Sequence, residues 1–438
     1  MNAFKRTLLE QIGAGRCHVG IVGMGYVGVP LALTFVERAG LKVTGFDVDA
    51  AKVHALESGR SYLLHVGAER IARARASGLF TATTDLDELG RPDALLIAVP
   101  TPLTAAREPD LAHVVRTGEA IAKRLRPGQL VVLESTTYPG TTDGLLRELL
   151  ERSGLRSGRD FFLAFSPERE DPGNREFSTA TIPKVVGGVD SDSGEVARAL
   201  YARALERVVL APTARVAEAA KLTENVFRAV NMALVNELKV VFEQMGIDVW
   251  DVLDAAATKP FGFMRFDPGP GPGGHCIPID PLYLAWKARK SGVAARFVEL
   301  ADEINTGMTR YVVAKLEAAL HERHQRLEGS RVLILGVAYK RDSDDPRESP
   351  ALALIASLLV RGAVVAYHDA RVPQLAAGSH GPALASQPLT DELVQAHDAL
   401  LICTDHGDVE YARVLERARL IVDTRGVYRA PRANVVKA

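Results

Sequence analysis

The segment HVGIVGMGYVG, residues 18–28, decides the fold of the N-terminal part, because an apolar strand runs directly into a glycine-rich turn. Gly23, Gly25 and Gly28 form the pattern G-x-G-x-x-G. In such a turn the first glycine permits the tight bend, the second lets the backbone approach a pyrophosphate, and the third allows close helix–sheet packing. The free N–H groups of the following helix point at that pyrophosphate. The segment therefore predicts a dinucleotide-binding α/β domain.

The second strand of this unit, KVTGF, ends at Asp47. A carboxylate there suits the ribose hydroxyls of NAD and opposes the 2′-phosphate of NADP, so we expect NAD as the cofactor. VPTP (99–102) and ESTT (134–137) end later strands, at the edge where ligands bind in open α/β sheets. Thr101 and Thr136 are therefore candidates for contacts to the cofactor or the reacting groups. The alternative is that they are loop threonines that cap helices.

Beyond these motifs, short apolar runs alternate with helix-length segments as far as about residue 210, which predicts a parallel sheet covered on both faces. Residues 213–245 contain no Gly or Pro and keep apolar residues three and four apart, so we expect one long helix that ends at Gly246. The strand–helix alternation resumes at RVLILGVAY, residues 331–339. The predicted fold is α/β, with two Rossmann-like doubly wound parallel-sheet domains joined by a central helical domain. The expected domains are 1–210 for NAD binding, 211–325 for the helical part and 326–438 for the C-terminal sheet.

Charge balance and cysteine usage argue against several classes of protein. The 53 Lys and Arg residues against 54 Asp and Glu leave a formal net charge of -1, whereas a nucleic-acid binder normally has a basic excess. Three widely spaced cysteines form neither a disulfide framework nor a zinc pattern, and no metal is expected. No stretch approaches the ~18 apolar residues of a membrane span, and the N-terminus has no apolar core of signal-peptide length. We therefore expect a cytoplasmic protein with no nucleic-acid or membrane partner.

The segment GPGPGGHCIPIDP, residues 269–281, carries the most distinctive chemistry. A thiol directly after a glycine-rich loop and near a helix start can have a lowered pKa and react as a thiolate. Asp280 follows Cys276 by four residues, so on one helical turn both side chains would face the same site. Cys17 and Cys403 lie on or beside apolar strands and are expected to be buried, unreactive thiols. Cys276 is therefore the predicted nucleophile.

The long helix contributes a polar stripe. Glu218, Lys221 and Asn225 recur at three- and four-residue intervals and so share one face. A Lys–Asn pair on an otherwise apolar helix suits the stabilisation of an oxyanion or the binding of a sugar hydroxyl. A solvated polar helix face is the alternative interpretation.

Together these motifs resemble the UDP-glucose/GDP-mannose dehydrogenase family over residues 17–428. The resemblance is carried by GMGYVG, FDVD, VPTP, EST, SPE, AKLTEN, GPGPGGHCIPIDP, YKRDSDDPRES and VDTRG. It implies an N-terminal NAD domain, a central helical domain that forms a homodimer or higher homo-oligomer, and a C-terminal domain that binds the nucleotide diphosphate of a UDP-sugar substrate.

The resemblance also implies a role for each site residue. Cys276 resembles the nucleophile and Asp280 its companion acid, while Thr136 and Glu168 resemble the pair that orders the catalytic water. The implied catalytic set is Cys276, Lys221, Asn225, Asp280, Thr136 and Glu168. The implied cofactor contacts are Gly23, Gly25, Tyr26, Val27, Gly28, Asp47, Lys52, Thr101, Thr136 and Arg347. The implied substrate contacts are Glu168, Lys221, Asn225, Phe266, Gly273, Lys340 and Arg425.

The reaction implied is an NAD-dependent, four-electron oxidation of a sugar C6 alcohol to the uronic acid through a thiohemiacetal and a thioester on Cys276. Four residues after the SPE glutamate, UDP-glucose dehydrogenases have a second Glu, whereas this sequence has Pro172. PEREDPGN, residues 167–174, instead resembles the branch that acts on UDP-N-acetylhexosamines, with UDP-N-acetylglucosamine expected first and its galacto epimer second. The alternatives are a UDP-glucose or GDP-mannose 6-dehydrogenase, a two-electron enzyme of the hydroxyacid-dehydrogenase type, and a non-catalytic NAD-binding regulatory protein.

Overall fold

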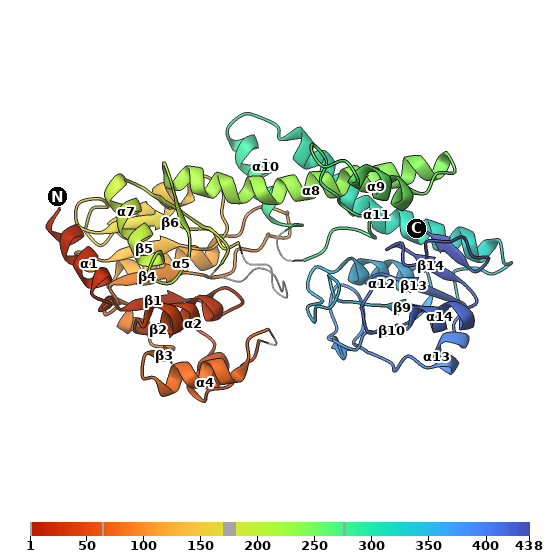
Figure 1. The fold of residues 1–438 in the computed structure, drawn as a ribbon, viewed down its shortest axis with the longest axis horizontal. Coiled ribbons are helices and arrows are strands. Elements are labelled where there is room, and N and C mark those ends of the chain that lie inside the picture. The colour runs from red at the N-terminus through yellow and green to blue at the C-terminus, as the bar shows by residue number, and fades with distance from the viewer. Residues whose placement is uncertain (1, 64, 170–180, 275–276) are drawn as a thin grey trace. The chain divides into compact units, whose positions relative to one another are not determined.

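The structure is a computed structural model that describes residues 2–63, 65–169, 181–274 and 277–438. The chain forms two compact units (Figure 1). Unit 1 comprises Met1–Glu224 and Leu282–Val293, and unit 2 comprises Asn225–Pro281 and Ala294–Ala438. Each unit contains one large β-sheet, so that the predicted pair of α/β sheets is confirmed.

Within the described residues, the sheet of unit 1 has eight strands in the order β3-β2-β1-β4-β5-β6-β7-β8. Neighbouring strands are parallel, except that β6 and β7 are antiparallel. The strands are β1 (Val19–Val22), β2 (Val43–Phe46), β3 (Phe80–Thr83), β4 (Ala94–Ile97), β5 (Leu130–Leu133), β6 (Phe162–Phe165), β7 (Lys184–Gly188) and β8 (Val208–Ala211). β1, β2, β4, β5 and β6 are buried along their whole length, as expected for parallel strands covered on both faces.

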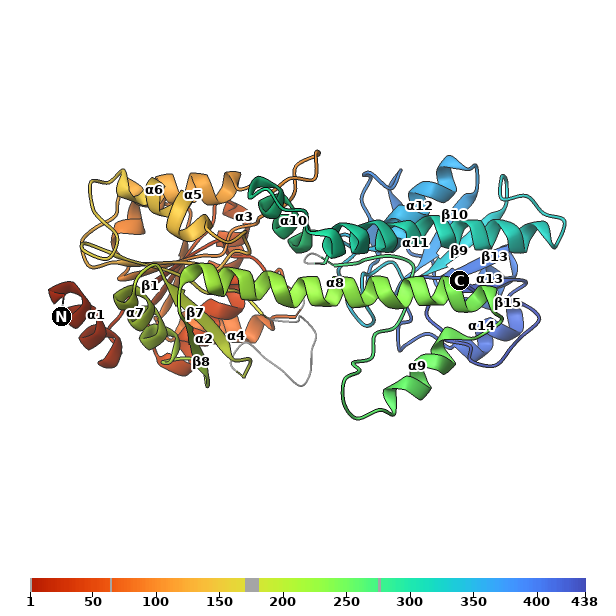
Figure 2. The same cartoon turned by 90° about the horizontal axis from the view of Figure 1, so that it is seen from above.

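Helices cover both faces of this sheet, with α2 and α7 on one side and α5 and α6 on the other (Figure 2). The helices of unit 1 ahead of residue 213 are α1 (Ala3–Gly13), α2 (Gly28–Ala39), α3 (Ala50–Glu57), α4 (Ala68–Ala76), α5 (Ala112–Ala122), α6 (Arg147–Glu151) and α7 (Ser191–Tyr201). A 3₁₀ turn, η1 (Leu86–Gly90), and a π turn, η2 (Thr141–Leu146), complete the set. Side chains of α1, α2 and α7 share one apolar core with the strands.

The sheet of unit 2 is parallel throughout its described part, in the order β10-β9-β13-β14-β15. Its strands are β9 (Arg331–Leu335), β10 (Val364–His368), β13 (Ala399–Ile402), β14 (Ile421–Asp423) and β15 (Val435–Lys437), and β11 (Gln374–Leu375) pairs separately with β12 (Leu384–Ala385). The helices outside the long central one are α9 (Val249–Ala257), α10 (Asp280–Lys290), α11 (Arg296–His321), α12 (Pro350–Val360), α13 (Asp391–Gln395) and α14 (Tyr411–Arg417). Most of α10 belongs to unit 1.

The predicted long helix is confirmed as α8 (Ala214–Gln244). Thr213 caps its start, because the Thr213 hydroxyl accepts the backbone N–H of Val216. Gly246 ends it by adopting a left-handed φ of 71°, which glycine adopts without strain. The boundary between the two units falls inside this helix, after Glu224.

In the described residues, none of the helices combines the length and the apolar composition that crossing a membrane would require.

Candidate active site

The glycine turn after β1 has the close contacts that its sequence pattern predicts. A Cβ on Gly23 would lie 2.5 Å from a backbone carbonyl oxygen at the end of β4, and a Cβ on Gly28 would lie 1.9 Å from the Gly23 oxygen. A Cβ on Gly25, by contrast, would have no heavy atom within 4 Å. This is the position at which the motif requires room for a pyrophosphate. Tyr26 stacks on a histidine ring, and Val27 immediately precedes α2. The turn therefore fits a dinucleotide.

Asp47, at the end of β2, is buried and oriented by the backbone. Its Oδ2 accepts the N–H of Met24 at 2.9 Å, and its Oδ1 accepts the N–H of Asp49 at 2.9 Å. Lys52, on α3, lies 3.5 Å from the same carboxylate. Because the carboxylate is fixed beside the glycine turn, it is placed to accept ribose hydroxyls and to repel a 2′-phosphate.

The two predicted threonines occupy the ends of neighbouring strands. Thr101 is buried after β4, and its carbonyl oxygen accepts the Tyr283 hydroxyl at 3.0 Å. Thr136 is half-buried after β5. The next residue, Thr137, is fully buried, and within the described part of the chain its hydroxyl has no hydrogen-bond partner. An unpartnered buried hydroxyl is costly unless a ligand or water satisfies it, so Thr137 is a candidate that the motif ESTT contained but that sequence reasoning missed.

Glu168 lies beside a buried ion pair that sequence reasoning also missed. Lys184, the first residue of β7, places its Nζ 2.5 Å from Glu134 Oε2 and 3.6 Å from Glu168 Oε2. The Tyr201 hydroxyl donates to the other oxygen of Glu134. Burial opposes the charge on Lys184, but the two carboxylates outweigh it and raise the Lys184 pKa. The ammonium therefore stays charged and binds Glu168 to the end of β5.

The polar stripe on α8 contains Glu218, which supports a neighbouring segment of the chain, and Lys221, which is a candidate site residue. Glu218 is fully buried and accepts the N–H groups of Gly140 and Thr142 at 2.7 and 2.8 Å. These bonds anchor the start of η2, so Glu218 has a structural role. Lys221, one turn later, is buried as well, which rules out a solvated polar face at this position.

Asn225 and Asp280, both members of the catalytic set that the resemblance implies, lie in direct contact. The Asn225 Nδ2 donates to Asp280 Oδ2 at 2.5 Å, and both side chains are buried. Asp280 opens α10. Cys276 and Pro172 lie outside the described residues, so the position of the predicted nucleophile and the substitution in PEREDPGN stay predictions.

The glycine-rich loop of unit 2 packs directly against Arg425. A Cβ on Gly269 would lie 2.7 Å from Arg425 Nη1, and the Gly269 N–H donates to the buried Asn236 side chain at 3.0 Å. Arg425 Nε donates to the Cys403 carbonyl oxygen at 2.6 Å. Burial lowers the Arg425 pKa, and within the described residues its terminal nitrogens have no hydrogen-bond partner. They are available for an anionic ligand.

The other predicted residues of unit 2 have less specific surroundings. Gly273 packs on Pro350, where a Cβ would lie 3.1 Å away. The ring of Phe266 lies 5.9 Å from that of a neighbouring phenylalanine and joins a hydrophobic cluster with α9. Lys340 lies over the ring of the adjacent tyrosine, and Arg347 forms an ion pair with Asp345 at 2.6 Å. The roles implied for these residues stay predictions.

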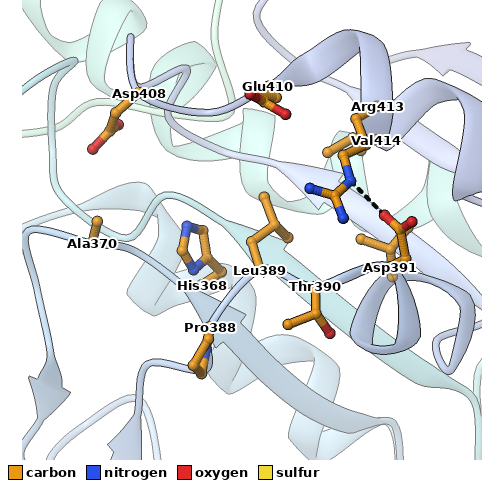
Figure 3. A pocket seen from close by; sticks show the side chains of 11 residues that line it. His368, Ala370, Pro388, Leu389, Thr390, Asp391, Asp408, Glu410, Arg413 and Val414 are labelled. Carbon is orange, nitrogen blue, oxygen red and sulfur yellow. Dashed lines mark hydrogen bonds and ion pairs between the residues drawn. The ribbon is translucent and has the colours of Figure 1, made fainter.

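A cavity of about 440 Å³ lies elsewhere in unit 2 (Figure 3). An ion pair between Arg413 and Asp391, with 2.6 Å between Nε and Oδ1, forms part of its wall. The cavity is lined by His368, Ala370, Pro388, Leu389, Thr390, Asp391, Val394, Asp408, Glu410, Arg413 and Val414. None of the predicted site residues is in this lining.

Three family models match the chain in order. They are the UDP-glucose/GDP-mannose dehydrogenase NAD binding domain over residues 17–205, the central domain over 215–307 and the UDP binding domain over 333–430. The UDP-N-acetyl-D-glucosamine 6-dehydrogenase of Pseudomonas aeruginosa is 35% identical over 392 residues, which cover 89% of this chain and 90% of the relative.

Solved structures of related proteins have the same fold. The UDP-D-ManNAc dehydrogenase from Pyrococcus horikoshii superposes with a TM-score of 0.87 at 29% identity, covering 96% of this chain and 98% of that one. The NDP-N-acetyl-D-galactosaminuronic acid dehydrogenase from Methanosarcina mazei superposes with a TM-score of 0.80 at 31% identity, covering 98% and 94%.

Proposed function

The chain belongs to the UDP-glucose/GDP-mannose dehydrogenase family of NAD-dependent oxidoreductases, and we propose that it oxidises the C6 alcohol of a UDP-N-acetylhexosamine to a carboxylate. The observation that carries this proposal is the buried hydrogen bond between Asn225 and Asp280. It joins the polar stripe of α8 to Asp280, four residues after Cys276, and so places a candidate acid or base beside a residue proposed to hold the sugar.

NAD, when bound at the glycine turn, supplies the hydride acceptor. Asp280, or Glu168 through water, would take the proton of the C6 hydroxyl during the first oxidation. The Cys276 thiolate would then form a bond to the aldehyde carbon and give a tetrahedral thiohemiacetal, whose oxygen Lys221 would stabilise. Loss of a second hydride, for which a second NAD would be the acceptor, would leave a thioester. Water ordered by Thr136 and Glu168 would then release the carboxylate and return the thiolate.

The substrate proposal rests on two kinds of support. Relatives named for UDP-N-acetyl-D-glucosamine, UDP-D-ManNAc and NDP-N-acetyl-D-galactosaminuronic acid all match most of the chain. In addition, this chain has Pro172 at the position where the resemblance places a second Glu in UDP-glucose dehydrogenases. The proline therefore replaces a charged side chain by an uncharged one. We place UDP-N-acetylglucosamine first and its galacto epimer second.

We expect purified protein to reduce two NAD for each UDP-N-acetylglucosamine consumed. Its kcat/KM should exceed that for UDP-glucose and GDP-mannose by about ten- to hundredfold, because a buried hydrogen bond to the acetamido group contributes about 1–3 kcal/mol. NADH absorbance and product mass, measured over a panel of these sugars and the galacto epimer, check both statements. One NADH with free aldehyde as product would contradict the covalent reaction, and a preference for UDP-glucose would contradict only the substrate.

We further propose a homodimer that forms through α8. Phe227, Leu234 and Val241 are 48%, 49% and 40% exposed and recur every seven residues, so they form an apolar stripe on one helix face. Exposed apolar stripes of this kind mark association surfaces. Leu234→Asp should shift the sedimentation coefficient to that of a monomer, whereas Val360→Asp, at an 88% exposed valine on α12, should not. A monomeric wild-type protein at micromolar concentration would refute the proposal.

A further inference from the structure

The loop of residues 337–349, between β9 and α12, carries Lys340 and Arg347 and contains two strained positions. Asp342 has φ 59° and Glu348 has φ 51°. A residue with a Cβ is sterically strained in this left-handed region, and such conformations persist only where surrounding contacts stabilise them. The conformation of the loop must therefore be fixed by contacts from other parts of unit 2.

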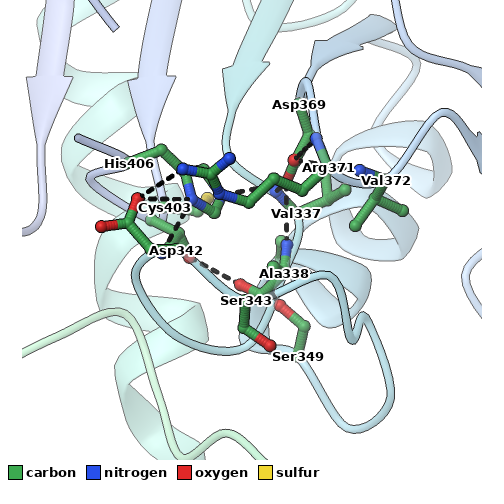
Figure 4. Close-up of polar contacts among 12 residues, drawn as sticks. Val337, Ala338, Asp342, Ser343, Ser349, Asp369, Arg371, Val372, Cys403 and His406 are labelled. Carbon is green, nitrogen blue, oxygen red and sulfur yellow. Dashed lines mark hydrogen bonds and ion pairs between the residues drawn. The ribbon is translucent and has the colours of Figure 1, made fainter. Parts of the chain in front are cut away.

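A buried imidazole supplies one of these contacts. His406, which follows β13, accepts the Asp342 backbone N–H on its Nδ1 at 3.0 Å. Its Nε2 must then carry the proton, and it lies 3.1 Å from Asp369 Oδ2. Figure 4 shows the ring between these two partners. A single side chain thus connects the strained position of the loop to the end of β10.

Asp369 fixes the beginning of the same loop. Its Oδ2 also accepts the N–H groups of Val337 and Ala338, at 2.8 and 3.0 Å. Burial alone would raise the pKa of Asp369, but the His406 ring and these N–H groups lower it to about 2. The carboxylate is therefore an ionised anchor that holds both the first residues of the loop and His406.

The Asp342 side chain connects the loop to the segment after β13 and to Arg371. Its Oδ1 accepts the Gly407 N–H at 3.0 Å and Arg371 Nη2 at 2.9 Å. Ligand atoms of Asp342, His406 and Asp408 lie within 4.8 Å of one another, as in a metal site. Both ring nitrogens of His406 already have partners, however, and Arg371 pairs with both carboxylates. The cluster is a hydrogen-bond network whose ring nitrogens and carboxylates are already used by one another and by Arg371.

We propose that His406 is a positioning residue, which holds the 337–349 loop in the conformation that lets Lys340 bind the diphosphate of the UDP-sugar. The inference rests on the proposed function, since it needs a UDP-sugar substrate and the substrate contact that the family resemblance implies for Lys340. Without the ring, the Asp342 N–H loses its acceptor and Asp369 loses a donor, so the strained loop is released. Affinity for the nucleotide falls, while the chemistry at C6 is left largely unchanged.

Three substitutions separate the two hydrogen bonds of His406. The Oδ1 of His406→Asn lies the same number of bonds from the backbone as Nδ1 and can accept the Asp342 N–H. His406→Gln retains only a donor towards Asp369, and His406→Leu retains neither. With UDP as the probe in titration calorimetry, the Leu and Gln variants should bind about tenfold more weakly, and the Asn variant should stay within about twofold of wild type.

His397→Leu is the matched control. His397 is equally buried in the same sheet domain, but among the described residues its ring makes a hydrogen bond only to a carbonyl of α13, at 2.7 Å. The control should lower the melting temperature without changing UDP affinity. If UDP affinity follows melting temperature across all four variants, or if His406→Leu binds UDP like wild type, the inference is overturned.

Lys340→Met separates failure of this inference from failure of the proposed function. Unchanged UDP affinity in Lys340→Met would remove the proposed role of Lys340 and with it the premise of the inference. If Lys340→Met weakens binding, the double variant with His406→Leu should bind within about twofold of Lys340→Met alone, because both changes remove the same contact. Multiplicative losses in the double variant would mean that His406 acts independently of Lys340, which overturns the inference.

Discussion

Cys276→Ser is expected to reduce acid formation by at least about three orders of magnitude, because a hydroxyl is a far poorer nucleophile than a thiolate near neutral pH. Binding of the UDP-sugar should change little, since the substitution removes a covalent step and keeps a side chain of similar size. NADH formation and the mass of the product measure the first effect, and titration calorimetry measures the second.

Cys17→Ala provides the control for this prediction. Cys17 is fully buried beside β1, and burial raises its pKa to about 12, so its thiol is not a nucleophile near neutral pH. The Cys17 variant should therefore keep the activity of the wild type. Normal turnover by Cys276→Ser, or an equal loss in both variants, would exclude Cys276 from the reaction.

Lys184→Met should have the largest effect on stability. The Lys184 ammonium lies between the carboxylates of Glu134 and Glu168, and the Glu134 side chain has no solvent exposure. Removal of one partner leaves a buried charge without compensation, which costs about 3–5 kcal/mol. The midpoint of urea denaturation should fall accordingly, and amides of β5 and β7 should exchange faster with deuterium.

Two further variants distinguish this cause from a loss of packing. Lys184→Arg retains the charge and should recover most of the stability. The double variant Glu134→Gln with Lys184→Met removes the unpaired charge and should unfold at a higher urea concentration than Lys184→Met alone. If the double variant is no more stable than Lys184→Met, the ion pair is not the cause of the loss.

The sequence predicts those elements whose signal is local. The buried strands β1, β4 and β5 were predicted because each is a continuous apolar run, and α8 was predicted within one residue at each end because Gly246 marks its end. β7 and β8 were not predicted. β7 begins with Lys184 and ends in two glycines, and β8 is an edge strand with two exposed residues, so neither is a recognisable apolar run.

In the candidate site as well, the features with a local sequence signal were predicted and those that depend on distant contacts were not. Gly23, Gly28 and Asp47 could be predicted because one strand–helix–strand unit fixes their geometry, with the two glycines in its turn and Asp47 after its second strand. The sequence placed Glu218 beside Lys221 on one stripe, but its role as an anchor of η2 depends on N–H groups far away in the chain. The contact of Lys184 with Glu134 likewise depends on the order of strands in the sheet, which residue spacing does not reveal.

The hydrogen bonds of Asp369 have a consequence for what the second sheet can bind. In both, a glycine with positive φ follows the first strand, and a carboxylate after the second strand accepts an N–H of that turn: Gly23 with Asp47, and Gly336 with Asp369. Asp369, however, also accepts the N–H groups of Arg371 and Val372 and contacts His406, so a ribose would find its acceptor sites occupied. The carboxylate at this position in the second sheet therefore supports its own backbone, which argues against a second dinucleotide site there.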